Sequence, residues 1–443
     1  MTTRIVILGG GAAGLTTALK LQKKHATRHI DITLIDELPY YTYQPLLPEV
    51  AGGHIQARDV TVSLHKALRH SNVVQASVTG LDSTGKSVTV MTPDGEHQKV
   101  SYDHLVIALG AVTRTFPTPG LAENGVGFKT VEEAQYVRDR ILGNIARAAS
   151  VQDLAERRKL LTTVFIGGGY TGVEAMAELD DAAKAAINGY RSLSREELSF
   201  VLVEALDRVA PEVGPELSQW TLGQLRARGI DIRLNTTMPS CIDGNVVLSD
   251  GEAIPAGAIV WTAGVKPNPV LAEMNLPLGP KGHVNVNATL QVETSGGVKI
   301  DGVWALGDGA QVPNLLATTQ PAYYPPNAQN AVRQAGRVSA NILAMMTGRP
   351  LVEYRHKSLG TVASFGIGKG AGIVKGIKLK NVPAWLAHRG YHLYAMPTTN
   401  RKMRILAGWV TNLFAGGDTT PIVGRSNPRA SFLKTTPVVT KQK

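Results

Sequence analysis

Two segments of the chain share an order of apolar and polar positions that is typical of a nucleotide-binding fold. Residues 5–8 and 164–166 are short apolar runs, as expected of buried parallel strands. They lead into glycine-rich turns within the stretches IVILGGGAAGL and TVFIGGGYTGVE. After the first turn, Leu15, Ala18 and Leu19 recur at helical spacing on one face. The pattern therefore predicts a strand, a turn and a helix twice in one chain.

Both turns have the glycine spacing GxGxxG. Such a turn brings backbone N–H groups and the positive end of the helix against a dinucleotide pyrophosphate. One turn of this kind is weak evidence, because glycine turns also occur for ordinary steric reasons. Two of them, each in a strand–turn–helix context, predict two dinucleotides bound by one chain. The glycines are Gly9, Gly11 and Gly14 in the first copy and Gly167, Gly169 and Gly172 in the second.

The next predicted strand ends in an acidic residue in both copies. Residues 30–35 are followed by Asp36, and residues 199–203 are followed by Glu204. A carboxylate at this position accepts hydrogen bonds from a ribose hydroxyl of the adenosine. It would repel a 2′-phosphate, so the second copy favours NADH over NADPH, although Arg208 nearby tempers that preference.

Further apolar runs predict how the two copies are connected. Strands are expected within residues 102–114 and 259–269. A third strand is expected within residues 303–313, and it places Asp308 in a glycine turn. The alternation between residues 73 and 100 predicts a small antiparallel layer. We therefore predict an α/β fold of two Rossmann-like domains, the second inserted in the first. The expected boundaries are 1–115 and 285–345 for the first domain, 116–284 for the second, and 346–443 for a C-terminal region.

The C-terminal region has two amphipathic stretches. Apolar residues recur at helical spacing within 401–414, and a second stripe within 385–396 includes Tyr391 and Tyr394. Residues 371–443 hold twelve Lys or Arg and one acid, whereas the first 370 residues hold 34 of each sign. A basic amphipathic end predicts docking on an anionic membrane surface. A dimer interface, ordinary core or a solvated tail would show a similar pattern.

Composition narrows the possible chemistry. The chain has 443 residues, a net charge of +11 and one cysteine, Cys241, which excludes an intrachain disulfide and a dithiol redox centre. No apolar run reaches the ~18 residues of a membrane-spanning helix, and a strand is expected from Arg4, which leaves no room for a signal peptide. We therefore expect a protein made and kept in the cytoplasm. The basic tail lacks a nucleic-acid-binding module, so nucleic-acid binding is disfavoured.

The order of motifs resembles the two-dinucleotide-binding flavoproteins with a glutathione-reductase-like fold, and over essentially the whole chain the type II NADH:quinone dehydrogenases. The resemblance implies hydride transfer from NADH to FAD, and then transfer of two electrons to a membrane quinone, menaquinone or ubiquinone. It also implies a homodimer bound peripherally to the cytoplasmic face of the cell membrane. The matching stretches are YYTYQPLLPEVAGG, GGGYTGVEAMAEL, VEALDRVAP, WTAGVKPNP, ALGDGA, QPAYYPPNAQNAVRQAG, GTVASFGIGKGAG, AWLAHRGYHLY, NRKMRI and GWVTNLF.

The same resemblance implies three sets of site residues. The residues at the reacting end are Glu174, Gln329 and Arg333. Those expected to contact FAD are Gly9, Gly11, Ala13, Gly14, Asp36, Ala108, Gly110, Asp308, Ala328 and Gln329. Those expected to contact NADH are Gly167, Gly169, Tyr170, Thr171, Gly172, Glu204 and Gly264.

Two features leave alternatives open. Glu174 is either an acid that helps to deliver protons or a first-turn carboxylate favoured by the helix dipole. The family pattern AQxAxQ has Arg333 at its last position here, and Gln334 follows one residue later, rotated by ~100° around the helix. The electron acceptor is therefore a quinone or, alternatively, a ferredoxin-like protein. A third reading is a flavoprotein sensor in which turnover is incidental. Sulfide:quinone oxidoreductases and disulfide reductases need paired cysteines, which the single Cys241 does not supply.

Overall fold

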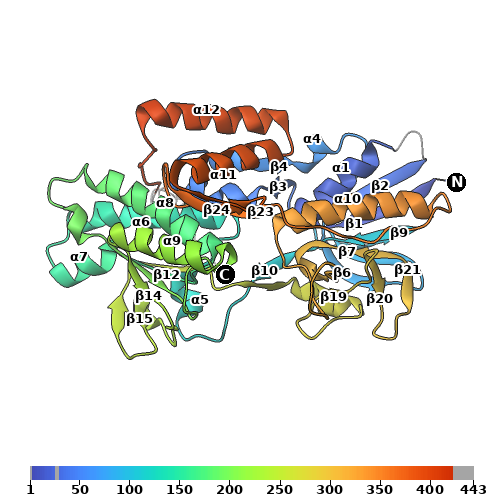
Figure 1. The fold of residues 1–443 in the computed structure, drawn as a ribbon, viewed down its shortest axis with the longest axis horizontal. Helices are drawn as coiled ribbons and strands as arrows, with labels where there is room; N and C mark the ends of the chain where they lie inside the picture. The colour runs from blue at the N-terminus through green and yellow to red at the C-terminus, as the bar shows by residue number, and fades with distance from the viewer. Residues whose placement is uncertain (1, 25–28, 423–443) are drawn as a thin grey trace, which may run out of the picture.

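The computed structural model describes residues 2–24 and 29–422 and contains two parallel-sheet units, one at each end of the molecule (Figure 1). The first sheet has six strands in the order β20-β21-β9-β1-β2-β5, all parallel except β20. Its strands come from both the beginning and the middle of the chain. They are β1 (Thr3–Leu8), β2 (Ile30–Asp36), β5 (Asn72–Gln75), β9 (His104–Ile107), β20 (Gln291–Glu293) and β21 (Lys299–Ala305).

The second sheet has five parallel strands in the order β11-β17-β12-β13-β14. All of them come from the chain between β9 and β20, so the second unit is inserted in the first, as the sequence predicts. The strands are β11 (Gly125–Val126), β12 (Thr162–Ile166), β13 (Ser199–Val203), β14 (Asp231–Arg233) and β17 (Ala258–Trp261). Cys241 is buried in a small core at this sheet, away from both glycine turns.

Helices cover the two sheets and join them. The first helix, α1, packs beside α10 on the first sheet, and α8 packs against α3 and α6 between the units (Figure 1). The helices of these units are α1 (Ala12–Gln22), α3 (Leu47–Ala51), α4 (Leu64–Ala67), α5 (Leu121–Asn124), α6 (Val131–Ala148), α7 (Leu154–Leu161), α8 (Tyr170–Ile187), α9 (Pro215–Ala227) and α10 (Ala328–Met345).

The predicted antiparallel layer is present, with one correction. It consists of β6 (Ser77–Asp82), β7 (Ser87–Met91) and β8 (His97–Ser101). Residues 72–75 lie outside it, because β5 pairs in parallel with β2 in the first sheet. Short paired strands complete the units: β3 (Tyr40–Thr42), β4 (Thr61–Ser63), β10 (Ala111–Thr113), β15 (Asn245–Val247), β16 (Ala253–Pro255), β18 (Val265–Pro267), β19 (Val284–Asn285) and β22 (Ala310–Gln311).

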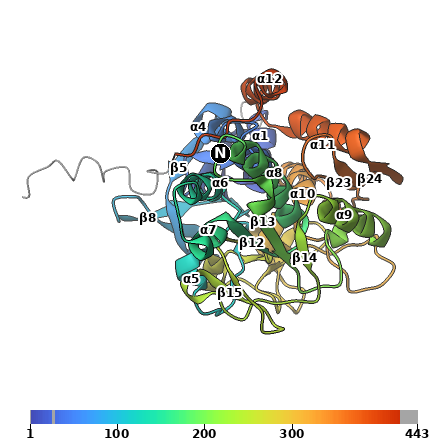
Figure 2. The ribbon, with the colours of Figure 1, turned by 90° about the vertical axis from the view of Figure 1, so that its left-hand side faces the viewer.

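The C-terminal region forms a layer across the junction of the two units. An antiparallel sheet of β23 (Gly360–Ser364), β24 (Gly370–Val374) and β25 (Ile377–Lys380) is covered by α11 (Asn381–Ala395). Helix α12 (Thr399–Ala415) lies outermost, at the top of both views (Figures 1 and 2). Within residues 2–24 and 29–422, no helix combines the length and apolar character needed to cross a membrane.

Candidate functional site

The first glycine turn has a backbone that only glycine fits. Gly9 has a φ of +97°, and a Cβ there would collide with the carbonyl oxygen of Ala108 on the neighbouring strand. A Cβ on Gly14 would collide with the carbonyl oxygen of Gly9. The absence of a Cβ at both glycines lets the start of α1 lie close to the ends of the strands. The turn therefore opens at the carboxyl ends of β1 and β9.

Asp36 closes one side of this turn. Its carboxylate accepts hydrogen bonds from the backbone N–H of Gly10, at 2.5 Å, and of Leu38, at 2.7 Å. Burial raises the pKa of the carboxyl group, and the two backbone hydrogen bonds oppose that shift. The side chain is thus fixed at the end of β2, where the sequence predicts a partner for a ribose hydroxyl.

The second turn repeats this geometry. Gly167 has a φ of +109°, and a Cβ there would lie 2.6 Å from the carbonyl carbon of Thr262. The carboxylate of Glu204 accepts from the backbone N–H of Gly168, at 2.5 Å, and of Leu206, at 2.8 Å. Glu204 therefore corresponds in structure to Asp36, which supports two nucleotide sites of the same design.

Arg208 is engaged away from this carboxylate. Its guanidinium makes two hydrogen bonds to Asp207, at 2.8 and 2.9 Å. The cation that tempers the sequence-based preference for NADH is thus paired with an acid in the same loop. This arrangement favours an unphosphorylated ribose beside Glu204.

Both helix N-termini at the turns fit a pyrophosphate. Gly11 and Gly169 are the N-cap residues of α1 and α8, with no side-chain cap and no acidic residue in the first helical turn. A Cβ on Gly11, Gly110 or Gly264 would meet no atom within 4 Å, so these positions border open space. Free backbone N–H groups and glycine-lined space are what FAD at the first turn and a nicotinamide dinucleotide at the second would need.

The remaining predicted contacts are distributed around these turns. Ala13 and Ala108 are buried beside the first turn, and Thr171 is exposed at the start of α8. Tyr170 is half-buried, and burial raises the pKa of its hydroxyl. Ala328 is exposed at the start of α10. They remain predicted nucleotide contacts.

Asp308 lies in the turn that follows β21, near two basic residues, Lys129 and His283, that the sequence analysis did not single out. Burial raises the pKa of Asp308, while the charges of Lys129 and His283 oppose that shift. Burial in turn lowers the pKa of Lys129, and Asp308 opposes this. Lys129 is far from Asp308 in the sequence, so the electrostatic interaction between them could not be read from a local motif.

Helix α10 begins directly after Asn327, which follows two prolines. The Asn327 side chain accepts a hydrogen bond from the backbone N–H of Asn330 at 2.8 Å and caps the helix. Gln334 is buried and accepts from the N–H of Gly307 at 2.8 Å. It therefore holds the Asp308 turn and does not take the place of the missing family glutamine. Arg333, next to it, is exposed.

Gln329 and Glu174 are attached to opposite ends of β23. The Gln329 amide donates to the carbonyl oxygen of Gly360 at 3.4 Å and contacts His356 Nε2 at 2.9 Å through its oxygen. Glu174 accepts from the backbone N–H of Ser364 at 2.8 Å and lies beyond the first turn of α8, so its interpretation as a first-turn carboxylate is wrong. Four residues of an extended strand span about 13 Å. The C-terminal sheet thus sets the separation between the start of α10 and the start of α8.

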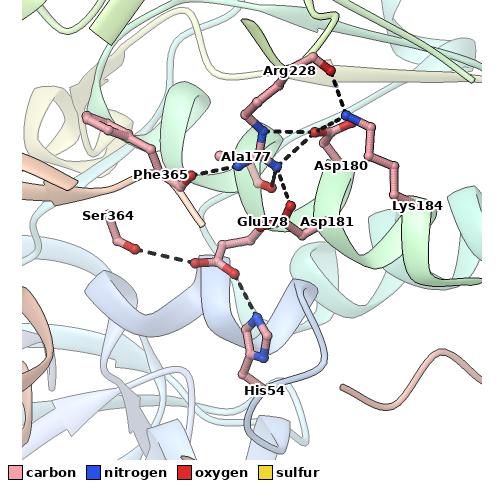
Figure 3. Close-up of polar contacts among 9 residues, drawn as sticks. All are labelled: His54, Ala177, Glu178, Asp180, Asp181, Lys184, Arg228, Ser364 and Phe365. Carbon is pink, nitrogen blue, oxygen red and sulfur yellow. Dashed lines mark hydrogen bonds and ion pairs between the residues drawn. The ribbon is translucent and has the colours of Figure 1, made fainter. Parts of the chain in front are cut away.

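One turn after Glu174, α8 carries part of a group of buried charges that the sequence analysis missed (Figure 3). Glu178 contacts His54 Nε2 at 2.9 Å and accepts from the Ser364 hydroxyl at 3.4 Å. Arg228 donates to the Phe365 carbonyl at 2.8 Å and pairs with Asp180, also at 2.8 Å. These bonds join α8 to α3 and to the C-terminal sheet. The partners come from distant parts of the chain, which explains why no spacing rule indicated them.

Comparison with known proteins agrees with this geometry. Residues 3–335 match the model of the pyridine nucleotide-disulphide oxidoreductase family. The chain belongs to this family. A demethylphylloquinone reductase of Synechocystis sp. is 31% identical over 92% of this chain and 96% of its own length. A type II NADH:quinone oxidoreductase of Staphylococcus aureus is 30% identical over 84% of this chain and 90% of its own. These relatives confirm the predicted resemblance to the type II dehydrogenases of the family.

A solved family structure confirms the fold. The NDH2 of Plasmodium falciparum, in complex with NADH, superposes with a TM-score of 0.86 at 19% identity, covering 95% of this chain and 100% of that one. The match extends over the C-terminal layer as well as the two nucleotide-binding units. This member of the pyridine nucleotide-disulphide oxidoreductase family has a single cysteine, buried in a core, so its chemistry involves no disulphide within the chain.

Proposed function

We propose that this chain is a type II NADH:quinone oxidoreductase, with FAD at the first glycine turn and NADH at the second. The observation that carries the proposal is the attachment of Glu174 and Gln329 to one strand of the C-terminal layer. This strand links the helix that follows the NADH turn to the helix that lies over the FAD turn. Relatives of about 30% identity over most of the chain that are named as quinone reductases support the same reaction.

The residues of the two turns would position the reactants. The N-terminus of α1 and Asp36 would hold the pyrophosphate and ribose of FAD, and Asp308 would contact its flavin half. Gly167, Gly172 and Glu204 would hold NADH. FAD, when bound, supplies the acceptance of a hydride and the release of two electrons. The protein contributes orientation, exclusion of water and control of protons at Glu174.

The C-terminal layer would place the acceptor site at a membrane. Exposed apolar residues occur along α12 and part of α11, and the first turns of α12 carry the basic residues Arg401, Lys402 and Arg404. Cations at a helix N-terminus oppose the helix dipole, so lipid phosphates explain them better than helix stability does. The exposed apolar residues of the two helices are Val382, Leu386, Tyr391, Tyr394, Met403, Leu406, Val410, Leu413 and Phe414.

We also propose peripheral binding to the cytoplasmic face of the membrane and a homodimer. The same apolar layer offers surface for a lipid bilayer and for a second copy. The proposed domain boundaries are 1–115 with 285–345, 116–284, and 346–443. Residues 423–443, which hold the last cations, lie outside the described residues.

Stopped-flow absorbance of the purified holoprotein with liposomes tests the function. NADH is added to reduce the flavin, and menaquinone or ubiquinone analogues are then added. We expect fast reduction followed by quinone-dependent reoxidation. Fast reduction without a quinone response would overturn the proposal and favour a ferredoxin-like protein acceptor. Slow reoxidation by every acceptor would favour a flavoprotein sensor.

A further inference from the structure

Helix α11 places two histidines one turn apart next to Glu174. His388 is 3% exposed, and its Nε2 lies 3.2 Å from Glu174 Oε1. The ring centroids of His388 and His392 are 4.4 Å apart. His392 Nδ1 in turn lies 2.9 Å from the hydroxyl of Tyr43. Titratable groups therefore form a continuous line from Glu174 through α11.

The line has a buried inner end and a partly exposed outer end. His388 Nδ1 is buried without a hydrogen-bond partner among the described residues, on a ring that packs against His392. His392 is only partly buried and packs against the exposed Tyr391, with ring centroids 5.2 Å apart. An unpaired buried nitrogen is costly in a folded protein, which indicates a role beyond packing.

Charges around His388 favour a proton at this position. Burial lowers the pKa of His388, but the hydrogen bond to Glu174 and the charges of Glu174, Glu49 and Glu178 outweigh burial, so the pKa is raised. Burial and the charge of His388 lower the pKa of His392 well below its ordinary value. The other charged groups of the cluster are Arg389, paired with Glu49 at 3.5 Å, and His54, paired with Glu178.

We propose that His388 and His392 form a proton relay that resupplies Glu174 from the face of the molecule covered by α11 and α12. The proposal rests on the proposed function, because the proton is destined for a quinone. Glu174 Oε1 is occupied by Ser364 N and His388, whereas Oε2 makes no hydrogen bond within the described part of the chain. That oxygen is the one left to face an acceptor.

The overall reaction needs one proton from solution in each turnover. A quinone takes up two electrons and two protons, and NADH supplies both electrons and one proton as a hydride. In the relay, the N–H bond at His388 Nε2 breaks as its proton passes to the Glu174 carboxylate and forms an O–H bond. That O–H bond breaks in turn as the carboxyl group gives a proton to a quinone oxygen, which restores the carboxylate. His388 recovers a proton from the side of His392, which takes it from solvent.

Stopped-flow measurements on variants separate the relay from the flavin chemistry. The variants are His388→Gln and His392→Gln, with His54→Gln as the matched control, since His54 is a buried histidine paired with the neighbouring Glu178. In liposomes, NADH should reduce the flavin of all three at the wild-type rate. Reoxidation by 2-methyl-1,4-naphthoquinone should be at least about tenfold slower in His388→Gln and His392→Gln. It should be unchanged in His54→Gln.

Chemical rescue separates proton transfer from packing. Imidazole added to His388→Ala should restore reoxidation, because it returns a titratable ring to the space beside Glu174. Pyrazole has the same size but is a far weaker base, and it should not restore the rate. Equal rescue by both molecules would show that His388 only fills space and would overturn the relay.

A measurement that needs no turnover provides an independent check. In ¹⁵N-histidine NMR of the oxidised holoenzyme, the signal absent from His388→Gln should titrate above the ordinary histidine range. The midpoint of this titration should move to lower pH in Glu174→Gln. A midpoint that is the same in Glu174→Gln as in the wild type would contradict the proposal.

Failure of the relay can be told apart from failure of the function. If the wild type is reoxidised by the naphthoquinone and His388→Gln matches it, only the relay is overturned. If the naphthoquinone does not reoxidise the wild type, the proposed function is overturned and the relay with it.

Discussion

Glu204 and Asp36 take the same place in two turns, so the residue that we propose sets nucleotide preference has a counterpart in the first turn. We expect Glu204→Gln to lower kcat/KM for NADH and raise it for NADPH, changing their ratio at least about tenfold. The substitution removes a carboxylate that would accept a hydrogen bond from a ribose hydroxyl of NADH and repel the 2′-phosphate of NADPH. A hydrogen bond to a charged group contributes about 1.5–3 kcal/mol. Steady-state kinetics with both nucleotides measures the ratio.

Asp36→Asn is the matched control for that experiment. It makes the same change at the first turn, where the proposed ligand is FAD, so it should weaken FAD retention and leave the ratio unaltered. An unaltered ratio in Glu204→Gln would mean that Glu204 only braces the turn through Gly168 and Leu206.

The buried pair of His54 and Glu178 predicts a pH dependence of stability. Burial lowers the pKa of His54, but the hydrogen bond to Glu178 and the charges of Glu178 and Glu49 together outweigh burial and raise the pKa above the ordinary 6.5. The stabilisation is therefore complete below pH 6.5 and is lost as the pH rises through the folded-state pKa. Burial raises the pKa of Glu178, but His54 and the charges of Arg389 and Arg228 together outweigh burial and lower the pKa below 4.5. The stabilisation from Glu178 is therefore lost only in more acidic solution.

His54→Gln should therefore lower the free energy of unfolding by about 3 kcal/mol between pH 4.5 and 6.5. The difference from the wild type should shrink above pH 6.5. Thermal unfolding of the holoprotein across this range measures it, with His65→Gln as an exposed control. If the difference in stability between wild type and His54→Gln instead grew with rising pH, the predicted direction of the pH dependence would be wrong.

At the scale of elements, two side chains of α12 hold it to the body: the Asn412 amide donates to the carbonyl oxygen of His54, and Trp409 contacts a buried carboxylate nearer the centre of the helix. The indole N–H of Trp409 donates to the buried carboxylate of Glu49. Arg389 pairs with the same carboxylate and lies against the rings of Trp385 and Trp409, 4.4 and 4.8 Å from their centroids. Ile405 is the only buried residue of α12 itself.

Trp409→Phe should loosen α12 without removing an aromatic ring. The substitution leaves a buried carboxylate oxygen short of a donor, at a cost of about 1–3 kcal/mol. Hydrogen exchange of peptides covering residues 399–415 should therefore become about tenfold faster or more. Trp385→Phe is the control, because the indole N–H of Trp385 has no partner in the described structure. Equal acceleration in both variants would argue that ring packing, and not the hydrogen bond, holds the helix.

Element order was predictable from the sequence, whereas the inward face of the C-terminal helices was not. The two glycine turns, Asp36 and Glu204 obey local spacing rules, so their geometry followed from sequence. The stripe on α11 led us to expect an apolar face at the membrane. Met396 is instead buried in the core, and the face toward the body carries His388 and Arg389. Their partners, Glu174 and Glu49, lie hundreds of residues away, and only the folded chain brings them together.

At the scale of the whole molecule, α11 belongs both to the proposed membrane surface and to the charge cluster. Removing the chain after Lys380 would take away His388, Arg389 and Trp409, so Glu174 would lose its histidine partner and Glu49 would lose both of its side-chain partners. A truncated protein would thus lose stability as well as membrane contact. Substitutions confined to the outward face of α12 are the cleaner test of docking.

Leu413→Glu combined with Phe414→Glu should release the protein from membranes while preserving its fold. The two side chains are 73% and 88% exposed, so they contribute little to the core. Each would gain about 1.5–3 kcal/mol on burial in lipid, so losing both lowers partitioning by at least about tenfold. Co-sedimentation with phosphatidylglycerol vesicles measures this. Leu154→Glu, at a 68% exposed site on α7, is the control for added charge and should bind normally.

The reaction itself distinguishes docking from an intrinsic loss of activity. The double variant should reduce its flavin with NADH at the wild-type rate, because both nucleotide turns lie in the units beneath the C-terminal layer. A water-soluble naphthoquinone should still reoxidise it, whereas menaquinone confined to vesicles should not. Normal turnover with vesicle-bound menaquinone would place the membrane contact elsewhere on the molecule. Loss of turnover with both quinones would instead place Leu413 and Phe414 at the acceptor site.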